Sequence, residues 1–175
     1  NDEWSLYFDG NVDISLWLDD ETTPEKKIKL LQLLDNIKDP IRKMDLLITA
    51  KNFVCPSLFM AEELRKKGGK TWVYQFNRVR DDKLAQKYGA FHGAELPYVF
   101  DTHDEWLPTN EKDRELTREI QSYWLSFAKT GNPNNDDAVT WPEYDSYNDS
   151  TLVLDDEIYQ RNHESSEICK VMDLF

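Results

Sequence analysis

One histidine lies on a glycine-flanked segment, directly ahead of an apolar and aromatic run. His92 stands between Gly89 and Gly93, and the run continues to Phe100. Because a histidine titrates near neutrality, it can take a proton from a nucleophile and return it to a leaving group. The glycines would give the loop unusual backbone freedom. The segment is where a hydrolase would hold its general base, and the alternative is a capping or partly buried histidine without a chemical role.

The block Gly89–Phe100 resembles the histidine loop of type-B carboxylesterases, the family of cholinesterases and related lipases, which reads roughly G-x-x-H-G-x-E-[LI]-x-[YF]-V-F. Every anchor of this pattern is present. Three further stretches resemble the same family in the same order along the chain, and the match is weaker between Ser5 and Asp45. They are Asn1-Asp2-Glu3, then Phe53–Ser57 with Trp72–Arg78, and Tyr123–Asn134 with Trp141–Tyr144.

This resemblance implies an α/β-hydrolase fold, of which residues 1–175 would be the C-terminal part of one catalytic domain, with a mostly parallel sheet and flanking helices. In such folds the triad runs nucleophile, acid, histidine, and the serine stands in a G-x-S-x-G elbow. None of the serines in this sequence has glycines two residues to either side, and no glycine-rich stretch could supply oxyanion-hole amides. We therefore expect the nucleophile to lie upstream of Asn1, and the chain alone to be inactive.

The resemblance assigns roles to three residues. Glu3 would be the triad acid, although Trp4 stands where glycine is usual, and His92 would be the general base. Glu95 matches an acidic position after the family histidine; it would support the loop through hydrogen bonds or serve as a carboxylate at a helix N-terminus. The substrate would be a small carboxylic ester. A non-catalytic cholinesterase-like adhesion domain is the main alternative, and an acidic interaction module fits the ordered motifs less well.

In cholinesterases, a cysteine in a segment like that around Cys55 pairs with one near the end of the catalytic domain, where Cys169 has its counterpart. The resemblance therefore predicts a Cys55–Cys169 disulfide and an oxidising compartment, secreted or periplasmic, with any signal peptide upstream. Two buried free thiols are the alternative. His92, His103 and His163 show no ligand spacing with the cysteines, so no metal and no cofactor are expected.

Composition indicates a folded domain with one core. The 175 residues are 39% hydrophobic and 13% aromatic. The net charge of −13 argues against a nucleic-acid partner, since phosphate binding needs clustered cations, and it favours a solvated surface. No apolar run reaches the ~18 residues of a membrane span. Asn148-Asp149-Ser150 fits an N-glycosylation acceptor, a triplet that is common by chance.

The elements that must position these residues follow from caps and periodicity. A strand at Trp72–Phe76 follows a helix, and this order suits a parallel crossover unit. Thr151–Leu154 is predicted to be a late strand. One apolar helix face, ended by Gly131, is formed by Leu116, Ile120, Tyr123, Trp124 and Phe127. Four other helices are predicted. One begins at Thr22 or Thr23 with Pro24 in its first turn, and a second runs from Asp45 through Phe53. A third runs from Pro56 to Gly68-Gly69, and the last lies in the tail from Glu157 near Cys169.

Overall fold

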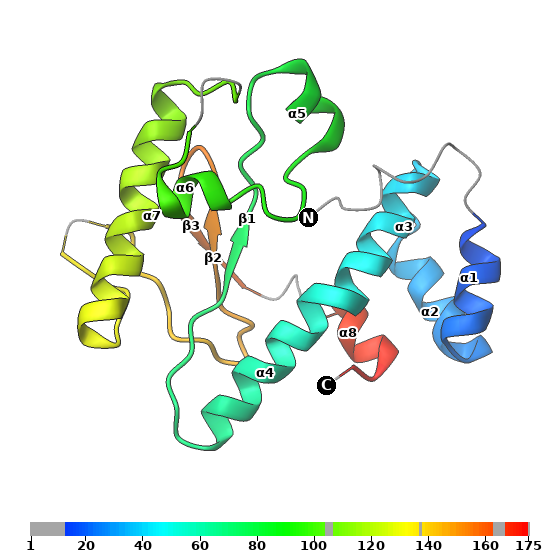
Figure 1. Cartoon of the computed structure of the whole chain (residues 1–175). Coiled ribbons are helices and arrows are strands. Elements are labelled where there is room, and N and C mark those ends of the chain that lie inside the picture. The colour runs from blue at the N-terminus through cyan, green and yellow to red at the C-terminus, as the bar shows by residue number, and fades with distance from the viewer. Residues whose placement is uncertain (1–12, 104–106, 137, 163–166, 175) are drawn as a thin grey trace.

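The computed structural model describes residues 13–103, 107–136, 138–162 and 167–174 (Figure 1). Helices surround a small sheet of three strands. The helices are α1 Ile14–Glu21, α2 Pro24–Leu33, α3 Pro40–Thr49, a π-helical turn Ala50–Val54, α4 Cys55–Lys66, α5 Lys83–Tyr88, α6 Leu96–Phe100, α7 Glu111–Thr130 and α8 Glu167–Met172. The strands are β1 Tyr74–Phe76, β2 Thr151–Leu154 and β3 Tyr159–Arg161.

The first helices begin at side-chain caps. Thr23 accepts a hydrogen bond from the amide of Lys26, and Pro24 occupies the first turn of α2, which confirms the predicted start. The start predicted at Asp45 is wrong. Asp39 caps α3 six residues earlier, immediately before Pro40. Asp45 instead lies buried inside α3, where its carboxylate pairs with Arg42.

Helix α3, the π-helical turn and α4 form one continuous helix, Pro40–Lys66. It ends as predicted at the glycine pair, where Gly68 has a φ of 81° and the amide of Gly69 bonds the carbonyl of Leu64. By length and hydropathy this helix could cross a membrane, but half of its most apolar stretch is buried in the fold, and the core helix of a soluble protein meets the same criterion. The expectation of no membrane span stays a prediction.

The sheet has the order β1-β2-β3. Strands β1 and β2 pair in parallel, with Tyr74 opposite Leu152. Both strands and a parallel arrangement were predicted from the sequence, but not that these two strands pair with each other. Strands β2 and β3 are antiparallel, because the short connection between them allows only a hairpin. β3 therefore occupies part of the tail predicted to be helical, and α8 occupies its end. All of β2 is buried, so both faces of this strand are covered.

Helix α7 supplies the largest face of the main core. A capping box joins Asn110 and Asp113 at its start, and Gly131 ends it with a φ of 74°. Leu116, Ile120 and Tyr123 are buried against β1, β2 and α6, which confirms the first part of the predicted stripe. Phe127, also predicted to be core, is 49% exposed. The apolar side chains of this helix face are therefore buried in its first part and more exposed toward its end.

A disulfide joins Cys55 at the start of α4 to Cys169 in α8, as the family resemblance implied. Both cysteines are fully buried in a second cluster of apolar side chains, which also contains Leu58 and Tyr144. A third cluster joins α1, α2 and α3, and side chains of α8 pack against it. Figure 1 shows α1, α2 and α8 on the opposite side of the long helix from α7. The disulfide therefore joins this helical part to the rest of the molecule.

Candidate active site

The histidine loop is a tight turn between α5 and α6. Gly89 ends α5 with a φ of 67°, and its amide donates to the carbonyl of Ala85. Gly93 has a φ of 83°, a conformation that L side chains rarely adopt. The amide of Leu96 then donates to the carbonyl of Gly93 as α6 begins. The two glycines thus perform the backbone role that their spacing around His92 predicted.

His92 is exposed, and its ring packs on Phe53. The ring centroids are 4.7 Å apart, and the planes are tilted by 33°. Phe53 belongs to the π-helical turn between α3 and α4. Such turns are frequent at functional sites because the extra residue changes the direction of the side chains that follow. An aromatic contact that limits the orientations of His92 therefore comes from an element far away in the sequence.

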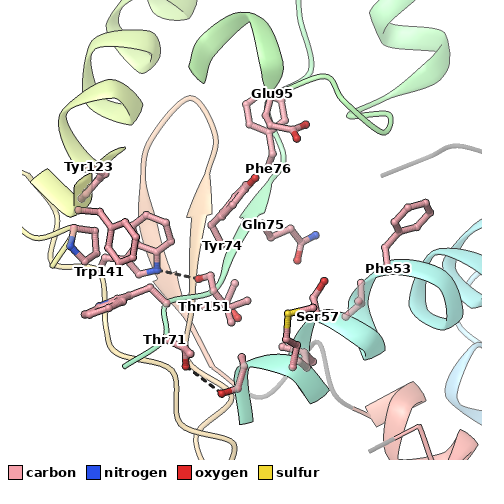
Figure 2. Close-up of a pocket in the computed structure, with 18 of the residues that line it drawn as sticks. Phe53, Ser57, Thr71, Tyr74, Gln75, Phe76, Glu95, Tyr123, Trp141 and Thr151 are labelled. Atoms are coloured by element: carbon pink, nitrogen blue, oxygen red, sulfur yellow. Dashed lines mark hydrogen bonds between the residues drawn. The ribbon is translucent and has the colours of Figure 1, made fainter. Parts of the chain in front are cut away.

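His92 and Phe53 line a half-open cavity of about 700 Å³. Figure 2 shows Phe53 and Ser57 on one wall, with Tyr74 and Gln75 of β1 across from them. The remaining wall is mostly aromatic. It includes Trp72, Phe76, Tyr123, Trp124, Phe127 and Trp141. The exposed Phe127 noted above is therefore part of this cavity, which offers an apolar, aromatic surface beside a histidine.

Glu95 also lines this cavity and stands at the cap position of α6. Its side chain makes no capping hydrogen bond, while its carbonyl accepts from the amides of Tyr98 and Val99. Burial raises the pKa of Tyr74, and the charge of Glu95 raises it further. Glu95 therefore places a negative charge near β1. Glu95 therefore lies at the N-terminus of α6, which is one of its two predicted positions. Support of the loop through hydrogen bonds stays a prediction.

The triad acid predicted from the sequence, Glu3, lies outside the described residues. The described part of the chain has no group of three His, Cys, Asp or Glu side chains that could hold a metal ion. Sequence reasoning missed Phe53 as a neighbour of His92, because aromatic residues give no signal of a contact between distant segments. The cysteine next to this turn was the nearest indication that the segment packs against the rest of the fold.

Comparison with known proteins decides the family. The sequence model of the carboxylesterase family matches residues 19–172. The chain belongs to the carboxylesterase family. It is similar to the para-nitrobenzyl esterase of Bacillus subtilis (strain 168), with 39% identity over 101 residues that cover 55% of this chain and 20% of that protein. It is also similar to the liver carboxylesterase of Sus scrofa, with 30% identity over 148 residues that cover 81% of this chain and 25% of that protein.

Solved structures agree with the sequence comparison. A solved PNB esterase superposes with a TM-score of 0.76 and 27% identity, covering 98% of this chain and 36% of that one. A thermophilic PNB esterase gives a TM-score of 0.71 over the whole of this chain. The molecule therefore has the α/β-hydrolase fold of these esterases. The chain spans about a third of the length of the solved relatives it matches.

Proposed function

We propose that this chain supplies the base and the acid of a Ser-His-Glu triad that hydrolyses carboxylic esters through an acyl-enzyme. His92 is the general base, Glu3 is the triad acid, and the serine and the oxyanion hole come from residues upstream of Asn1. The position of His92, on a glycine-flanked turn at the rim of an aromatic cavity in a member of the carboxylesterase family, carries the proposal. The absence of a G-x-S-x-G elbow from this sequence supports the division of roles.

Each proton in the reaction has a donor and an acceptor. His92 takes the hydroxyl proton of the serine as the serine oxygen attacks the ester carbonyl, and returns it to the departing alkoxide. A water molecule then gives a proton to His92 and attacks the acyl-enzyme, and His92 returns that proton to the serine oxygen as the acid is released. Glu3 holds the imidazole in the required tautomer and stabilises the imidazolium. The chemistry needs no metal or cofactor.

The Cys55–Cys169 disulfide supports a secreted or periplasmic location for the proposed enzyme, because disulfides persist in oxidising compartments. The substrate proposed for it is a small carboxylic ester, and the acidic net charge of −13 makes nucleic acid an unsuitable partner. The half-open, largely aromatic cavity beside His92 fits an apolar ester better than a highly charged ligand.

The test uses the polypeptide that includes the upstream residues, a short p-nitrophenyl ester and a serine-directed organophosphate. His92→Gln is expected to lower kcat by at least about 10³-fold, since removal of a triad member leaves only binding and oxyanion stabilisation. Lys87→Gln, which introduces the same side chain at an exposed position of α5, is the control and is expected to retain full turnover.

The proposal makes two further demands. Residues 1–175 alone should show no turnover and no covalent labelling, because they lack a nucleophile in an elbow. Turnover by this isolated chain, or full activity of the His92→Gln variant, would contradict the proposal. A longer polypeptide that neither turns over nor labels would instead favour the non-catalytic, cholinesterase-like adhesion domain.

A further inference from the structure

A buried ionic cluster lies where the end of β1, α6 and the start of α7 meet. Its centre is the carboxylate of Asp113, which is 1% exposed. One carboxylate oxygen accepts from Arg78 Nε at 2.9 Å and from the hydroxyl of Tyr98 at 2.7 Å. The other accepts from the amide of Asn110 at 2.9 Å. The carboxylate is thus bonded by three separate segments of the chain.

A second layer of polar groups encloses Tyr98. The guanidinium of Arg80 lies over its ring at 4.8 Å, and the ring of His103 meets it edge-on. Thr117 donates its hydroxyl proton to the carbonyl of Asp113, so Nε2 of His103, 2.6 Å from that hydroxyl oxygen, is the donor. Nδ1 of His103 then accepts from Arg80 at 3.3 Å. Each hydrogen bond of this layer is consistent with a neutral His103.

Burial and neighbouring charges determine the protonation states of Asp113 and His103. Burial would raise the pKa of Asp113, but the Asn110 amide, the Tyr98 hydroxyl and Arg78 together lower it. Burial, followed by the charge of Arg80, lowers the pKa of His103. Asp113 therefore stays ionised and His103 stays neutral near pH 7. An ionised carboxylate is also the stronger acceptor for the Tyr98 hydroxyl.

Tyr98 connects this cluster to the histidine loop. It lies in α6, whose first turn is bonded to the loop, because the amides of Leu96 and Tyr98 donate to the carbonyls of Gly93 and Glu95. A helix of five residues has too few internal bonds to hold its own orientation. The ring of Tyr98 is buried against Phe76, and its hydroxyl fixes the rotation of α6 about the helix axis. The direction of the turn that carries His92 follows from that rotation.

We propose that Asp113 is a positioning residue for His92, acting through the hydrogen bond from Tyr98 and the ion pair with Arg78. The proposal rests on the role proposed above for His92. Stability alone is a weak reason for such a cluster, since a buried ion pair often contributes no more than apolar residues of the same volume. A base displaced by as little as ~1 Å can lose about 10²-fold in rate, so orientation is the larger effect.

The test compares variants of the full-length polypeptide with matched controls. Tyr98→Phe removes one hydroxyl and keeps the ring and the ion pair, and it is expected to lower kcat about tenfold while KM changes less than about twofold. Asp113→Asn is expected to lower kcat further. The controls are Tyr144→Phe, another buried tyrosine, and Asp45→Asn, a buried carboxylate paired with Arg42 in α3; both should keep kcat within about twofold.

Melting temperatures and organophosphate labelling rates accompany each assay. We expect Tyr98→Phe to lower kcat and the labelling rate, and the control variants to keep both rates whatever their change in melting temperature. If Tyr98→Phe matches the control Tyr144→Phe in both rates, the positioning role is wrong. If Asp113→Asn does not fold, Tyr98→Phe decides alone. Activity in His92→Gln would overturn the proposed function itself, whereas an inactive His92→Gln beside a fully active Tyr98→Phe would overturn only this inference.

Discussion

At the scale of single residues, Gly93 and Gly131 offer a matched comparison. Their φ angles are 83° and 74°, and, apart from adjoining residues, no atom in the described part of the chain lies closer than 3.6 Å to a Cβ added at either. An alanine at either position should therefore cost about 1 kcal/mol through backbone conformation alone. In urea unfolding we expect the two variants to lose similar stability.

Only Gly93→Ala should also lower kcat of the full-length polypeptide, because only Gly93 shapes the turn that carries His92. Equal turnover in the two alanine variants would show that the backbone of this turn has no part in placing the base. The measurement separates a loss of stability, common to both variants, from a loss of geometry specific to one.

The sequence indicated the backbone conformation of this loop and gave no indication of the side chains that contact it. The pattern formed by Gly89, His92 and Gly93 lies within five consecutive residues, and the left-handed conformation of a glycine is also a local property of the chain. The contact of Phe53 with His92 depends on how two distant segments pack, and a single sequence holds no direct signal of it. Asp113 was not predicted to have a role. Its bonds to Tyr98 and Arg78 depend on tertiary structure.

At the scale of elements, the start of α7 gives a test of the capping box. The side chain of Asn110 accepts from the amide of Asp113, and the side chain of Asp113 accepts from the amide of Asn110. Asn110→Ala should lower the free energy of unfolding by about 1 kcal/mol, because one amide at the helix start loses its partner. Urea unfolding measures this loss.

Asn110→Ser is the matched control for this cap. A serine can still accept from the amide of Asp113, but it cannot replace the bond from the Asn110 amide group to Asp81. The serine variant should therefore keep most of the stability. If alanine and serine are equally destabilising, the cap itself contributes little, and the bond to Asp81 accounts for the loss.

Element types were predictable, and boundaries less so. The Asp39-Pro40 pair is a good helix start, yet the acid at Asp45 offers a similar local signal, and only burial against other helices distinguishes the two. The π-helical turn was not predictable. Its one extra residue shifts the helical repeat of apolar residues, but the segments before and after it each still show that repeat. Phe127 follows the apolar stripe of α7 but lies at the cavity, where the covering side chains end.

At the scale of the whole molecule, the disulfide closes a separation of 114 residues between α4 and α8. In the chain-entropy model such a loop contributes about 4–5 kcal/mol by restricting the unfolded chain. The double variant Cys55→Ser with Cys169→Ser should therefore unfold at a much lower urea concentration. A reductant should lower the midpoint of the parent protein toward that of the double variant, and should leave the double variant unchanged. A parent midpoint that does not respond to reductant would contradict a stabilising disulfide.

The overall architecture was predicted through the family resemblance more than through composition. Charge and hydrophobic content fit many acidic domains, whereas the ordered motifs around His92, Cys55 and Tyr123 occur together in one family. The helix-before-strand order indicated a parallel strand, but that β1 pairs with β2 came only from the structure. The hairpin to β3 was missed, because Tyr159–Arg161 is short and polar and resembles the loop around it.

The position of β1 at the end of the strand order also affects how the isolated chain behaves in solution. One edge of β1 bonds β2, and in the described part of the chain no strand bonds its other edge. Free amide and carbonyl groups along a strand edge can act as a template for another strand. The aromatic side chains beside it would add an adhesive surface. Residues 1–175 produced alone are therefore expected to self-associate as concentration rises, and dilute, cold conditions would suit their purification.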